Sequence, residues 1–498
     1  DGVIAQRVSL AEPQRGLGFT GLLPPTTTHV GPCGGWLMAD YGRSIFLFRR
    51  DLRISDNTGL IEASQASKTV VPLFIFDPRQ GARNPYFSPN AFQFMIESLE
   101  DLAHQVTAAR GRLSIFRGRP ETIVDRLIAE EDIEAVFINK DYTPFSRTRD
   151  AAIAEACQNK DVAFRCCSDT LLHKPTDVLK DGGEPYTIFS HFLRKARSVP
   201  VRPTNVAEVG NLSNVRLASE QREIRDDALK PSNQRTYMRR GRPQALEVLA
   251  TLHQFVDYET ARDYPAKNAT TRLSAHHKFG TCSMRETYHG IATQLGLEHQ
   301  LIIELFWRDF YSHIAYFFPH VFGGSFHRQY NAMVWDTDPA KFSAWCAGKT
   351  GFPIVDAGMR ELNATGFLHN RVRMIVASFL TKDLHIDWRW GERYFAQKLV
   401  DYDPAVNNGN WQWCASTGCD AQPYFRIFNP WLQQRRYDPH CTYIKAWIPE
   451  LRAIAPALVH SLDKLKGKTI PGYPAPIVDH PRESSRAKEA FRKIAKGL

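Results

Sequence analysis

Residues 44–48 read Ser-Ile-Phe-Leu-Phe and residues 70–76 read Val-Val-Pro-Leu-Phe-Ile-Phe, and both are apolar runs of strand length. Longer stretches with helical periodicity follow, among them 88–110 and 121–131. Three more strand-like runs lie further along, at 113–116, 135–139 and 164–167. Strands that alternate with helices predict an α/β fold in which a parallel sheet is covered by helices on both faces. The glycine fingerprint of ordinary dinucleotide-binding folds is missing.

On both sides of this region, changes in composition and periodicity divide the chain into segments. Residues 1–37, rich in Gly, Pro and Thr, are expected to be a disordered leader, with Met38 as the natural start. Residues 38–170 form the predicted α/β domain, and 171–245 read as a linker with scattered Pro, Asn and charge. Helical periodicity then predicts an all-helical domain at 246–475, and residues 476–498 are predicted to be a basic, solvated helical tail.

The composition narrows the class of protein. A chain of 498 residues suggests two domains, and 43% hydrophobic with 23% charged residues is typical of soluble globular proteins. Because no apolar run is long enough to span a bilayer, a membrane-embedded protein is excluded. The formal net charge of +10 favours a polyanionic partner, although solvated lysines alone could produce it. The nine cysteines lack zinc or disulfide spacing, so we expect a reducing interior compartment and no metal site.

Residues 270–274, Thr-Thr-Arg-Leu-Ser, stand directly before a predicted helix. Hydroxyls, backbone amides and a guanidinium at a helix start can cradle a phosphate. The same hydroxyls can instead cap the helix. The pattern by itself leaves both interpretations open.

A second pattern places Glu304, Trp307, Arg308 and Tyr311 on one face of a predicted helix. A carboxylate, an indole, a guanidinium and a phenol together make a poor core stripe, and exposed faces tend to avoid Trp. We therefore predict that this face lines a cavity. A surface salt bridge beside a half-buried Trp is the alternative.

Two later segments mix polar and aromatic residues. Residues 370–374, Asn-Arg-Val-Arg-Met, begin a predicted helix. Residues 401–413 are rich in Asn, Gly and Trp, and this content predicts a loop that packs amides and indoles against something flat.

Together these segments resemble the photolyase/cryptochrome family, from about residue 44 to about residue 475. The resemblance rests on residues 48–57, Phe-Arg-Arg-Asp-Leu-Arg-Ile-Ser-Asp-Asn, on 411–418, Trp-Gln-Trp-Cys-Ala-Ser-Thr-Gly, and on 423–430, Pro-Tyr-Phe-Arg-Ile-Phe-Asn-Pro. It implies a Rossmann-like antenna domain, a long linker and a helical FAD-binding domain. That arrangement matches the one predicted from the alternation of strands and helices.

The resemblance also implies an FAD site. Residues 270–274 with Tyr258 would hold the FAD phosphates, which favours the cradle over the cap. Arg373 and Asp401 would form an ion pair beside the flavin, Asp403 would hydrogen-bond its ring, and Asn407 would accept the hydrogen on its N5 atom. The implied cofactor-binding residues are Tyr258, Thr270, Thr271, Arg272, Leu273, Ser274, Arg373, Asp401, Tyr402, Asp403 and Asn407.

Three indoles, those of Trp411, Trp388 and Trp335, resemble the chain that carries an electron from the surface to photoexcited flavin in this family. We expect this chain to reduce oxidised FAD in light.

Three members of the family remain as alternatives: a cyclobutane pyrimidine dimer photolyase, a (6-4) photolyase and a cryptochrome, which signals without repair. Glu304 favours the first, because (6-4) enzymes resemble this region with a glutamine there and carry paired histidines where this chain has Asn370 and Met374. Asn407 is neither the aspartate nor the cysteine that signalling members often have. The implied partner is double-stranded DNA that contains pyrimidine dimers, bound by a monomer in the compartment that holds the DNA.

On the substrate side, Glu304 is expected to be a neutral carboxyl, because apolar surroundings disfavour its charge, and to donate to a pyrimidine carbonyl. Trp307 and Trp413 would stack on a flipped-out dimer, while Arg308, Arg371 and Gln433 would follow DNA phosphates. The residues expected to contact DNA or dimer are Glu304, Trp307, Arg308, Tyr311, Asn370, Arg371, Met374, Trp413 and Gln433.

A second chromophore is also implied. Asp77, Asp141 and Lys278 resemble contacts of the members that bind 8-hydroxy-5-deazaflavin, whereas the residues that hold folate in other members are replaced. Deazaflavin is the expected antenna, and a flavin or an empty pocket are the alternatives.

Overall fold

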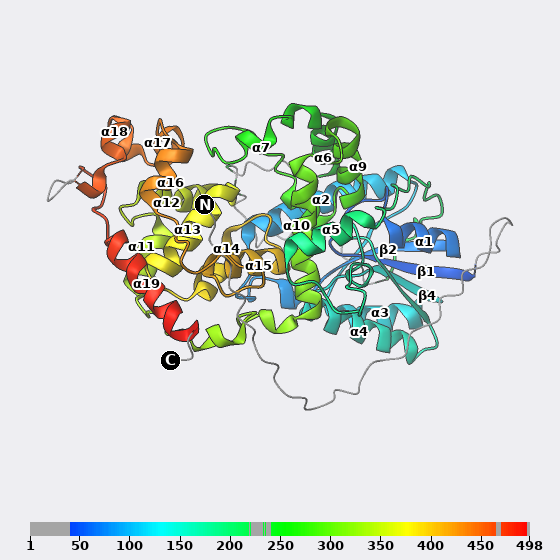
Figure 1. Ribbon diagram of the computed structural model, residues 1–498. Coiled ribbons are helices and arrows are strands. Elements are labelled where there is room, and N and C mark those ends of the chain that lie inside the picture. The colour runs from blue at the N-terminus through cyan, green and yellow to red at the C-terminus, as the bar shows by residue number, and fades with distance from the viewer. Residues whose placement is uncertain are drawn as a thin grey trace. The chain divides into compact units, whose positions relative to one another are not determined.

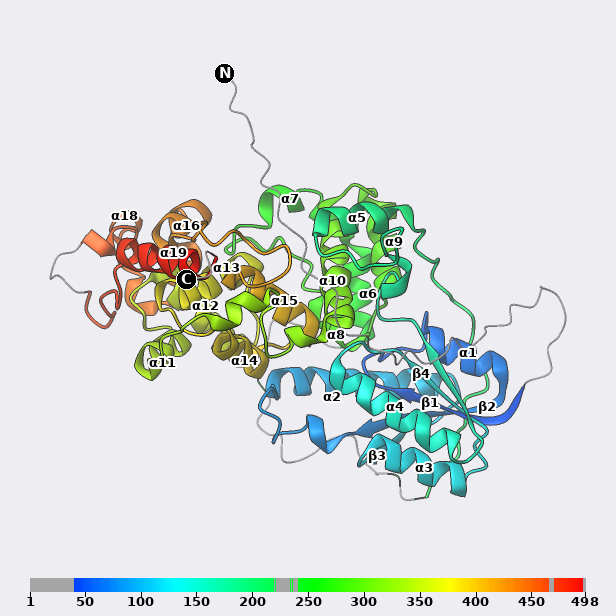
Figure 2. The same ribbon diagram turned by 60° about the horizontal axis from the view of Figure 1, so that its bottom comes forward.

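The computed structural model describes residues 40–218, 220, 233, 235, 241–464 and 470–495. The leader predicted at residues 1–37 lies outside the described residues. The described elements run from a five-stranded sheet to a long series of helices, as Figures 1 and 2 show from two sides.

All neighbouring strands of the sheet are parallel, in the order β3-β2-β1-β4-β5. The central strand β1 aligns its Ile45 with Val71 of β2 on one side and with Val136 of β4 on the other. The predicted apolar runs all became strands, with ends that moved by three residues or fewer: β1 (Tyr41–Phe48), β2 (Ser67–Phe76), β3 (Ser114–Arg117), β4 (Ala135–Asn139) and β5 (Ala163–Cys167).

Helices cover both faces of the sheet, as predicted. Alternate residues of β1 enter different cores: Phe46 packs in the cluster that includes α1 (Thr58–Ala66) and α2 (Pro89–Ala108). Ile45 packs in the cluster that includes α3 (Pro120–Glu130) and α4 (Pro144–Gln158). Figure 1 shows α1 and α2 above the sheet and α3 and α4 below it.

The predicted linker contains a helix that was not predicted, α5 (Phe189–Ser198). Its buried side chains, Phe189, Phe192 and Ala196, follow helical spacing, and basic residues in its last turn suit a helix C-terminus. The scattered Pro and charge around this short helix hid its periodicity.

The rest of the described chain is helical. Its α-helices are α6 (Arg242–Ala250), α7 (Tyr258–Ala261), α8 (Ser274–Phe279), α9 (Met284–Leu295), α10 (Gln300–Phe317), α11 (Pro339–Ala347), α12 (Pro353–Thr365), α13 (Asn370–Ser378), α14 (Trp388–Lys398), α15 (Pro404–Ala415), α16 (Pro430–Tyr437), α17 (Thr442–Trp447), α18 (Pro456–Val459) and α19 (His480–Ala495). A π-helical turn, η7 (Phe379–Asp383), continues α13. Among the described residues, no helix is both long and apolar enough to span a membrane.

The loop predicted at residues 401–413 is mostly helix α15, so that prediction was wrong. Asp403 caps the helix by accepting the N–H groups of Ala405 and Val406, and a proline follows it at the first helical position. Gly409, which weakens an isolated helix, is required by packing: a Cβ there would lie 2.1 Å from Cδ1 of Tyr311. Start signals and close packing therefore outweigh the loop-like composition.

The predicted helical tail is present as α19, but one of its faces is packed rather than solvated. His480, Ala487 and Phe491 are buried, and Nζ of Lys382 in η7 lies 3.5 Å from the centre of the Phe491 ring. His480 Nδ1 also lies 2.5 Å from a carboxylate oxygen of Asp383. The C-terminal helix is therefore part of the helical core.

Candidate active site

A cavity of about 460 Å³ lies among α8, α10, α13 and α15. In both ribbon views α10 and α15 lie next to each other, and these two helices carry much of its wall (Figures 1 and 2). Most of the predicted site residues line this one cavity: Tyr258, Thr270, Thr271, Arg272, Leu273, Ser274, Lys278, Glu304, Trp307, Arg308, Tyr311, Asn370, Arg373, Met374, Asp401, Tyr402, Asp403, Asn407, Trp411 and Trp413.

The hydroxyl-rich segment at 270–274 enters α8 without capping it. Leu273 occupies the N-cap position without a side-chain capping bond, and its own N–H group donates to the Thr271 hydroxyl oxygen at 3.5 Å. Arg272 has a left-handed backbone conformation, with φ of 54°, which turns the chain into the helix. The capping interpretation is therefore not supported, and the phosphate cradle stays a prediction.

The predicted ion pair between Arg373 and Asp401 is present, with Nη2 2.9 Å and 3.1 Å from the two carboxylate oxygens. Nε of Arg373 donates to the Leu368 carbonyl at 2.7 Å, and the Ser274 hydroxyl donates to Asp401 at 2.7 Å. These bonds fix a charged pair in the cavity wall and join it to the 270–274 segment.

Asp403 is surrounded by cations. It is ion-paired with Arg50, which follows β1, and Nη2 of Arg308 lies 3.9 Å from it. Burial alone would raise the pKa of Asp403, but Arg50, Lys278 and Arg308 outweigh burial and hold its pKa well below the usual range. A permanently ionised carboxylate therefore stands at this side of the cavity.

Asn407 is oriented by a buried carboxyl. Its Nδ2 atom donates to the Glu392 carbonyl at 3.2 Å and to Oε1 of Glu392 at 3.0 Å. Burial raises the pKa of Glu392 to about 7. Because Nδ2 is engaged by Glu392, the amide presents its Oδ1 atom, an acceptor, to the cavity. No sequence pattern pointed to Glu392, since it lies fifteen residues away on α14.

The face of α10 predicted to line a cavity does so, through Glu304, Trp307, Arg308 and Tyr311. The surface salt bridge offered as the alternative is nevertheless partly right, because Glu304 is ion-paired with Arg262. Gln300 Nε2 also donates to Oε1 of Glu304 at 2.8 Å. Both donors contact the same carboxyl oxygen, Oε1.

Arg262 is a cavity residue that the sequence patterns did not indicate. It follows the short helix α7 and lies over the ring of Tyr258, 5.4 Å from its centre. Its only sequence signal is its spacing of four residues from Tyr258, which many surface arginines share.

The three residues expected on DNA phosphates have different surroundings in the structure. Arg308 is largely buried, and it donates to the carbonyls of Thr170 at 2.9 Å and His277 at 3.3 Å. Arg371 is paired with Asp263 at 2.7 Å and covers the ring of Tyr437. Arg308 therefore lines the cavity, whereas Arg371 and Gln433 lie outside its lining, and contact of these three residues with DNA phosphates stays a prediction.

The three indoles share one apolar cluster, which Trp335 joins from its partly exposed edge. Trp411 is buried and lines the cavity, and Trp388, also buried, begins α14. A bridge between Asp336 and Ile386 brings the neighbours of Trp335 and Trp388 together, with a hydrogen bond from Asp336 N to the His385 carbonyl at 2.7 Å. The segments that carry Trp388 and Trp335 therefore lie side by side, and Trp411 lies at the cavity.

Of the three residues predicted for the antenna, Asp141 and Lys278 lie close enough to influence each other's pKa, whereas Asp77 has other partners. Asp77 pairs with Arg79 at 2.7 Å after β2, and Asp141 lies 3.4 Å from Arg50 after β4. Lys278 belongs to the main cavity, where burial and the nearby Arg50 lower its pKa to about 8. Only Asp77 and Asp141 lie near strand ends of the sheet.

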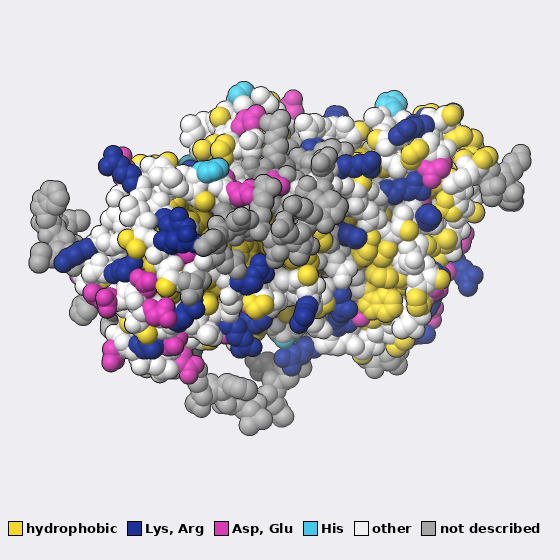
Figure 3. Space-filling view, turned by 180° about the vertical axis from the view of Figure 1, so that it is seen from behind, with side chains coloured by type: hydrophobic (Ala, Val, Ile, Leu, Met, Phe, Trp, Pro, Cys, Tyr) yellow, Lys and Arg dark blue, Asp and Glu magenta, His cyan; other side chains and the backbone are white. Residues whose placement is uncertain are grey.

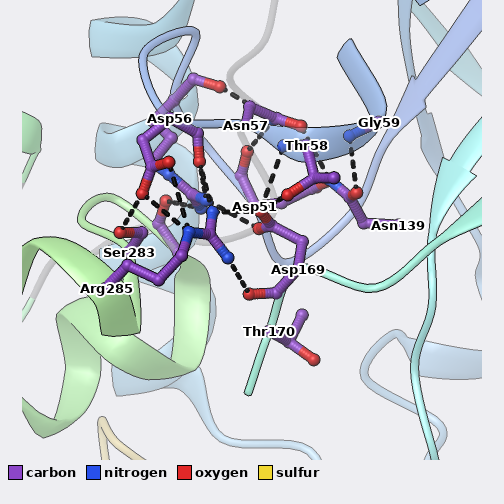
Figure 4. A network of polar contacts seen from close by, with 12 residues as sticks. Asp51, Asp56, Asn57, Thr58, Gly59, Asn139, Asp169, Thr170, Ser283 and Arg285 are labelled. Atoms are coloured by element: carbon purple, nitrogen blue, oxygen red, sulfur yellow. Dashed lines mark hydrogen bonds and ion pairs between the residues drawn. The ribbon is translucent and has the colours of Figure 1, made fainter. Parts of the chain in front are cut away.

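A buried network of charges joins the sheet region to the helices (Figure 4). Arg285 of α9 contacts Asp56 at 3.1 Å and Asp169 at 2.7 Å, and Arg53 contacts Asp169 at 2.6 Å. All four side chains are almost fully buried, so removing one would leave its partner's charge unpaired. The network holds the carboxyl ends of the strands against the helical region that forms the cavity.

Comparisons with known proteins agree with this architecture. The family model described as "DNA photolyase" matches residues 44–208, and the one described as "FAD binding domain of DNA photolyase" matches residues 301–493. A deoxyribodipyrimidine photo-lyase from Synechococcus is 37% identical, over 90% of this chain and 96% of that protein.

Two solved structures are similar over the same part of the chain. An archaeal photolyase from Sulfolobus tokodaii with two FAD molecules is 43% identical, with a TM-score of 0.82, over 91% of this chain and 100% of that one. A Synechocystis cryptochrome is 26% identical, with a TM-score of 0.81 and the same coverage. With its fold, its cavity and these relatives, the chain belongs to the DNA photolyase family.

Proposed function

We propose that this chain is a deoxyribodipyrimidine photo-lyase, which uses light and reduced FAD to split cyclobutane pyrimidine dimers in DNA into monomers. The main support for the proposal is a single cavity with two chemically different sides. One wall has the hydroxyls of 270–274 and the Arg373–Asp401 pair, and the other has the carboxylate of Glu304 beside the indole of Trp307.

The residues present fit FAD. Hydroxyls that do not cap α8 suit phosphates, and apolar side chains such as Phe395 and Met374 suit a flat ring. The Oδ1 atom of Asn407, oriented through Glu392, suits the ring's N–H group. When bound and reduced, FAD supplies the electron that a dimer accepts on illumination and later returns.

The chain's own residues would receive and hold the dimer. The carboxyl of Glu304 can accept a hydrogen bond from the imide N–H of a pyrimidine, while Arg262 beside it can donate to a carbonyl oxygen. Trp307 and Trp413 would stack on a dimer turned out of the duplex. The hydrogen bond from Glu304 to a pyrimidine carbonyl, expected from the sequence, stays a prediction.

The activity is tested with two duplexes, one with a cyclobutane dimer and one with a (6-4) lesion, each illuminated with chemically reduced protein. We expect restored pyrimidines in the first duplex only. Repair of the (6-4) lesion alone would identify the other kind of photolyase. Absence of repair on both duplexes would favour the second candidate, a cryptochrome, which the similarity to the Synechocystis structure supports.

We also propose a second chromophore near the carboxyl ends of β1, β2 and β4, where ligands of open parallel sheets commonly bind. The resemblance of Asp77 and Asp141 supports 8-hydroxy-5-deazaflavin. The Sulfolobus tokodaii photolyase, whose structure has two FAD molecules, supports a second flavin instead. Acid release of the chromophores and their chromatographic separation distinguish one FAD with a deazaflavin from two FAD per chain.

We propose that the partner of the protein is double-stranded DNA. We also propose that the protein acts as a monomer, in the compartment that holds the DNA. The net charge of +10 supports this partner.

A further inference from the structure

The ring of Phe189 lies flat on the indole of Trp307, with ring centres 3.5 Å apart and an angle of 10° between the planes. Phe189 is the first residue of α5, in the segment between the sheet and the helical region. Trp307 belongs to α10 and lines the cavity. One face of the indole is therefore covered by a residue from a distant part of the chain.

The start of α5 is fixed by the segment that follows α15. Oδ2 of Asp420 accepts the backbone N–H of Phe189 at 2.9 Å, and α5 has no side-chain cap of its own. A carboxylate at this place satisfies a free N–H group and interacts favourably with the helix dipole. The position of Phe189 is thus set by the same segment of chain that continues from the helix carrying Asn407 and Trp411.

The rest of α5 is anchored separately. Phe192 is almost fully buried, and its ring contacts are with Phe310, at 5.3 Å, and His313, at 5.2 Å. Phe189 also touches Phe310 edge-on, at 5.6 Å. The two phenylalanines therefore share a buried setting on α10, but Phe189 is the one whose ring lies parallel to Trp307.

We infer that Phe189 is a positioning residue for dimer recognition: it fixes the plane of Trp307 so that the other face of the indole is ready to stack on a turned-out dimer. The inference rests on the proposed function, in which Trp307 receives the dimer. Stacking requires parallel rings, and an indole already held in its plane loses less freedom on binding. Undamaged bases stay in the duplex, so affinity for undamaged DNA does not depend on this plane.

The test measures the affinity of the FAD-loaded full chain for a duplex with one cyclobutane dimer and for the same duplex without damage. Phe189→Leu keeps an apolar side chain but removes the flat ring, whereas Phe189→Tyr keeps the ring. Phe192→Leu is the matched control, since it makes a similar change in the same helix away from Trp307. We expect Phe189→Leu to weaken dimer binding by roughly three- to tenfold and to leave undamaged DNA unaffected. Phe189→Tyr and Phe192→Leu should keep the wild-type preference.

Further variants make the test independent of folding defects in Phe189→Leu. Asp420 is exposed, so Asp420→Ala moves the start of α5 without touching a ring, and it should also lower the preference, whereas Asp420→Asn, which keeps an acceptor oxygen, should retain it. In a Trp307→Ala background, Phe189→Leu should cause no further loss.

Several results would overturn the inference: an unchanged preference in Phe189→Leu or Asp420→Ala, an equal loss in Phe192→Leu, or additive losses in the Trp307→Ala background. If the variants give any of these results but the wild-type protein repairs dimers, the proposed function remains intact. A wild-type protein with no preference for the dimer would overturn the proposed function and the inference with it.

Discussion

The carboxyl of Glu304 is held by two donors. Arg262 pairs with it, and Gln300 donates to the same oxygen, Oε1. A guanidinium that contacts a pyrimidine carbonyl binds it more tightly once the ring has taken up an electron. The effect of the Glu304–Arg262 pair should therefore be felt mainly after the ring has been reduced, when splitting competes with loss of the electron.

Glu304→Ala is therefore expected to lower the yield of repair per absorbed photon, by about twofold or more, with a smaller effect on dimer affinity. The yield is measured with the dimer at saturation, so weaker binding cannot account for a loss. Glu298→Ala, which removes an exposed carboxyl just before α10, is the control and should leave the yield unchanged. Equal yields in Glu304→Ala and wild type would leave Glu304 without a part in repair.

Glu392 offers a test of the environment behind Asn407. Burial raises its pKa to about 7, although the hydrogen bond from Asn407 and the charge of Arg393 act in the opposite direction. At a pH between 4.5, the ordinary pKa of this carboxyl, and about 7, the carboxyl has lost its proton in the unfolded chain but keeps it in the folded protein. The stability contributed by this group is therefore fully present at low pH and is lost as pH rises through about 7.

Glu392→Gln does not titrate, so its stability relative to wild type should improve on going from about pH 5 to about pH 8, by on the order of 3 kcal/mol. Thermal unfolding of both proteins at the two pH values measures the change. Glu489→Gln, at an exposed carboxyl of α19, should show no such change. If the difference in stability between Glu392→Gln and wild type is the same at both pH values, Glu392 does not bind a proton in the folded protein as described.

At the scale of the element, α15 connects the cavity to the indoles. It carries Asn407 and Trp411, and α14 packs so closely against it that a Cβ on Gly391 would lie 2.2 Å from Cη2 of Trp411. Trp388 begins α14, and the bridge between Asp336 and Ile386 brings the segment of Trp335 beside it. Each step of the proposed electron path therefore follows a packed contact between elements.

Trp411→Phe should abolish the reduction of oxidised flavin by light, while repair by chemically reduced protein persists. The reason is that phenylalanine keeps the packing but is much harder to oxidise than an indole. Trp431→Phe changes another buried indole of the same apolar cluster, outside the cavity lining, and should photoreduce normally. Spectra recorded during illumination decide between the two outcomes, and photoreduction at the wild-type rate in Trp411→Phe would exclude this path.

Periodicity predicted the elements that bury one face or both. The five strands and the cavity-lining face of α10 follow from local spacing, because burial imposes that spacing. The helix α15 was mistaken for a loop because of its Gly and Asn residues. These residues are required by contacts with Tyr311 and Val321, which are far away in sequence. Arg262 and Arg285 were missed for the same reason, since the sequence around a single charged residue does not indicate which distant residue it will pair with in the fold.

At the scale of the whole molecule, the excess of basic residues is the basis for DNA binding. The net charge is +10, and Figure 3 shows Lys and Arg side chains spread over one face of the molecule rather than gathered at one point. Arg308 donates to a backbone carbonyl and Arg371 is paired with Asp263, so we expect much of the attraction to phosphates to come from the broader surface charge.

Binding to duplex DNA should weaken steeply with salt, because each phosphate contact releases counterions. We expect more than about a tenfold loss of affinity between roughly 50 and 200 mM salt, for damaged and undamaged duplex alike. Fluorescence anisotropy of labelled duplexes measures both. The ratio of the two affinities should change much less, because the dimer is held by stacking and hydrogen bonds inside the cavity. Affinity that does not depend on salt would contradict the electrostatic account.

The central claim is light-driven repair by reduced FAD in this one cavity. The most direct measurement counts the cyclobutane dimers that remain in a duplex after incubation with protein that is either reduced or oxidised, each in light and in darkness, with an electron donor withheld so that the oxidised protein stays oxidised. The account predicts that dimers disappear only in the illuminated sample of reduced protein. Loss of dimers in darkness, or their persistence in the illuminated reduced sample, would contradict it.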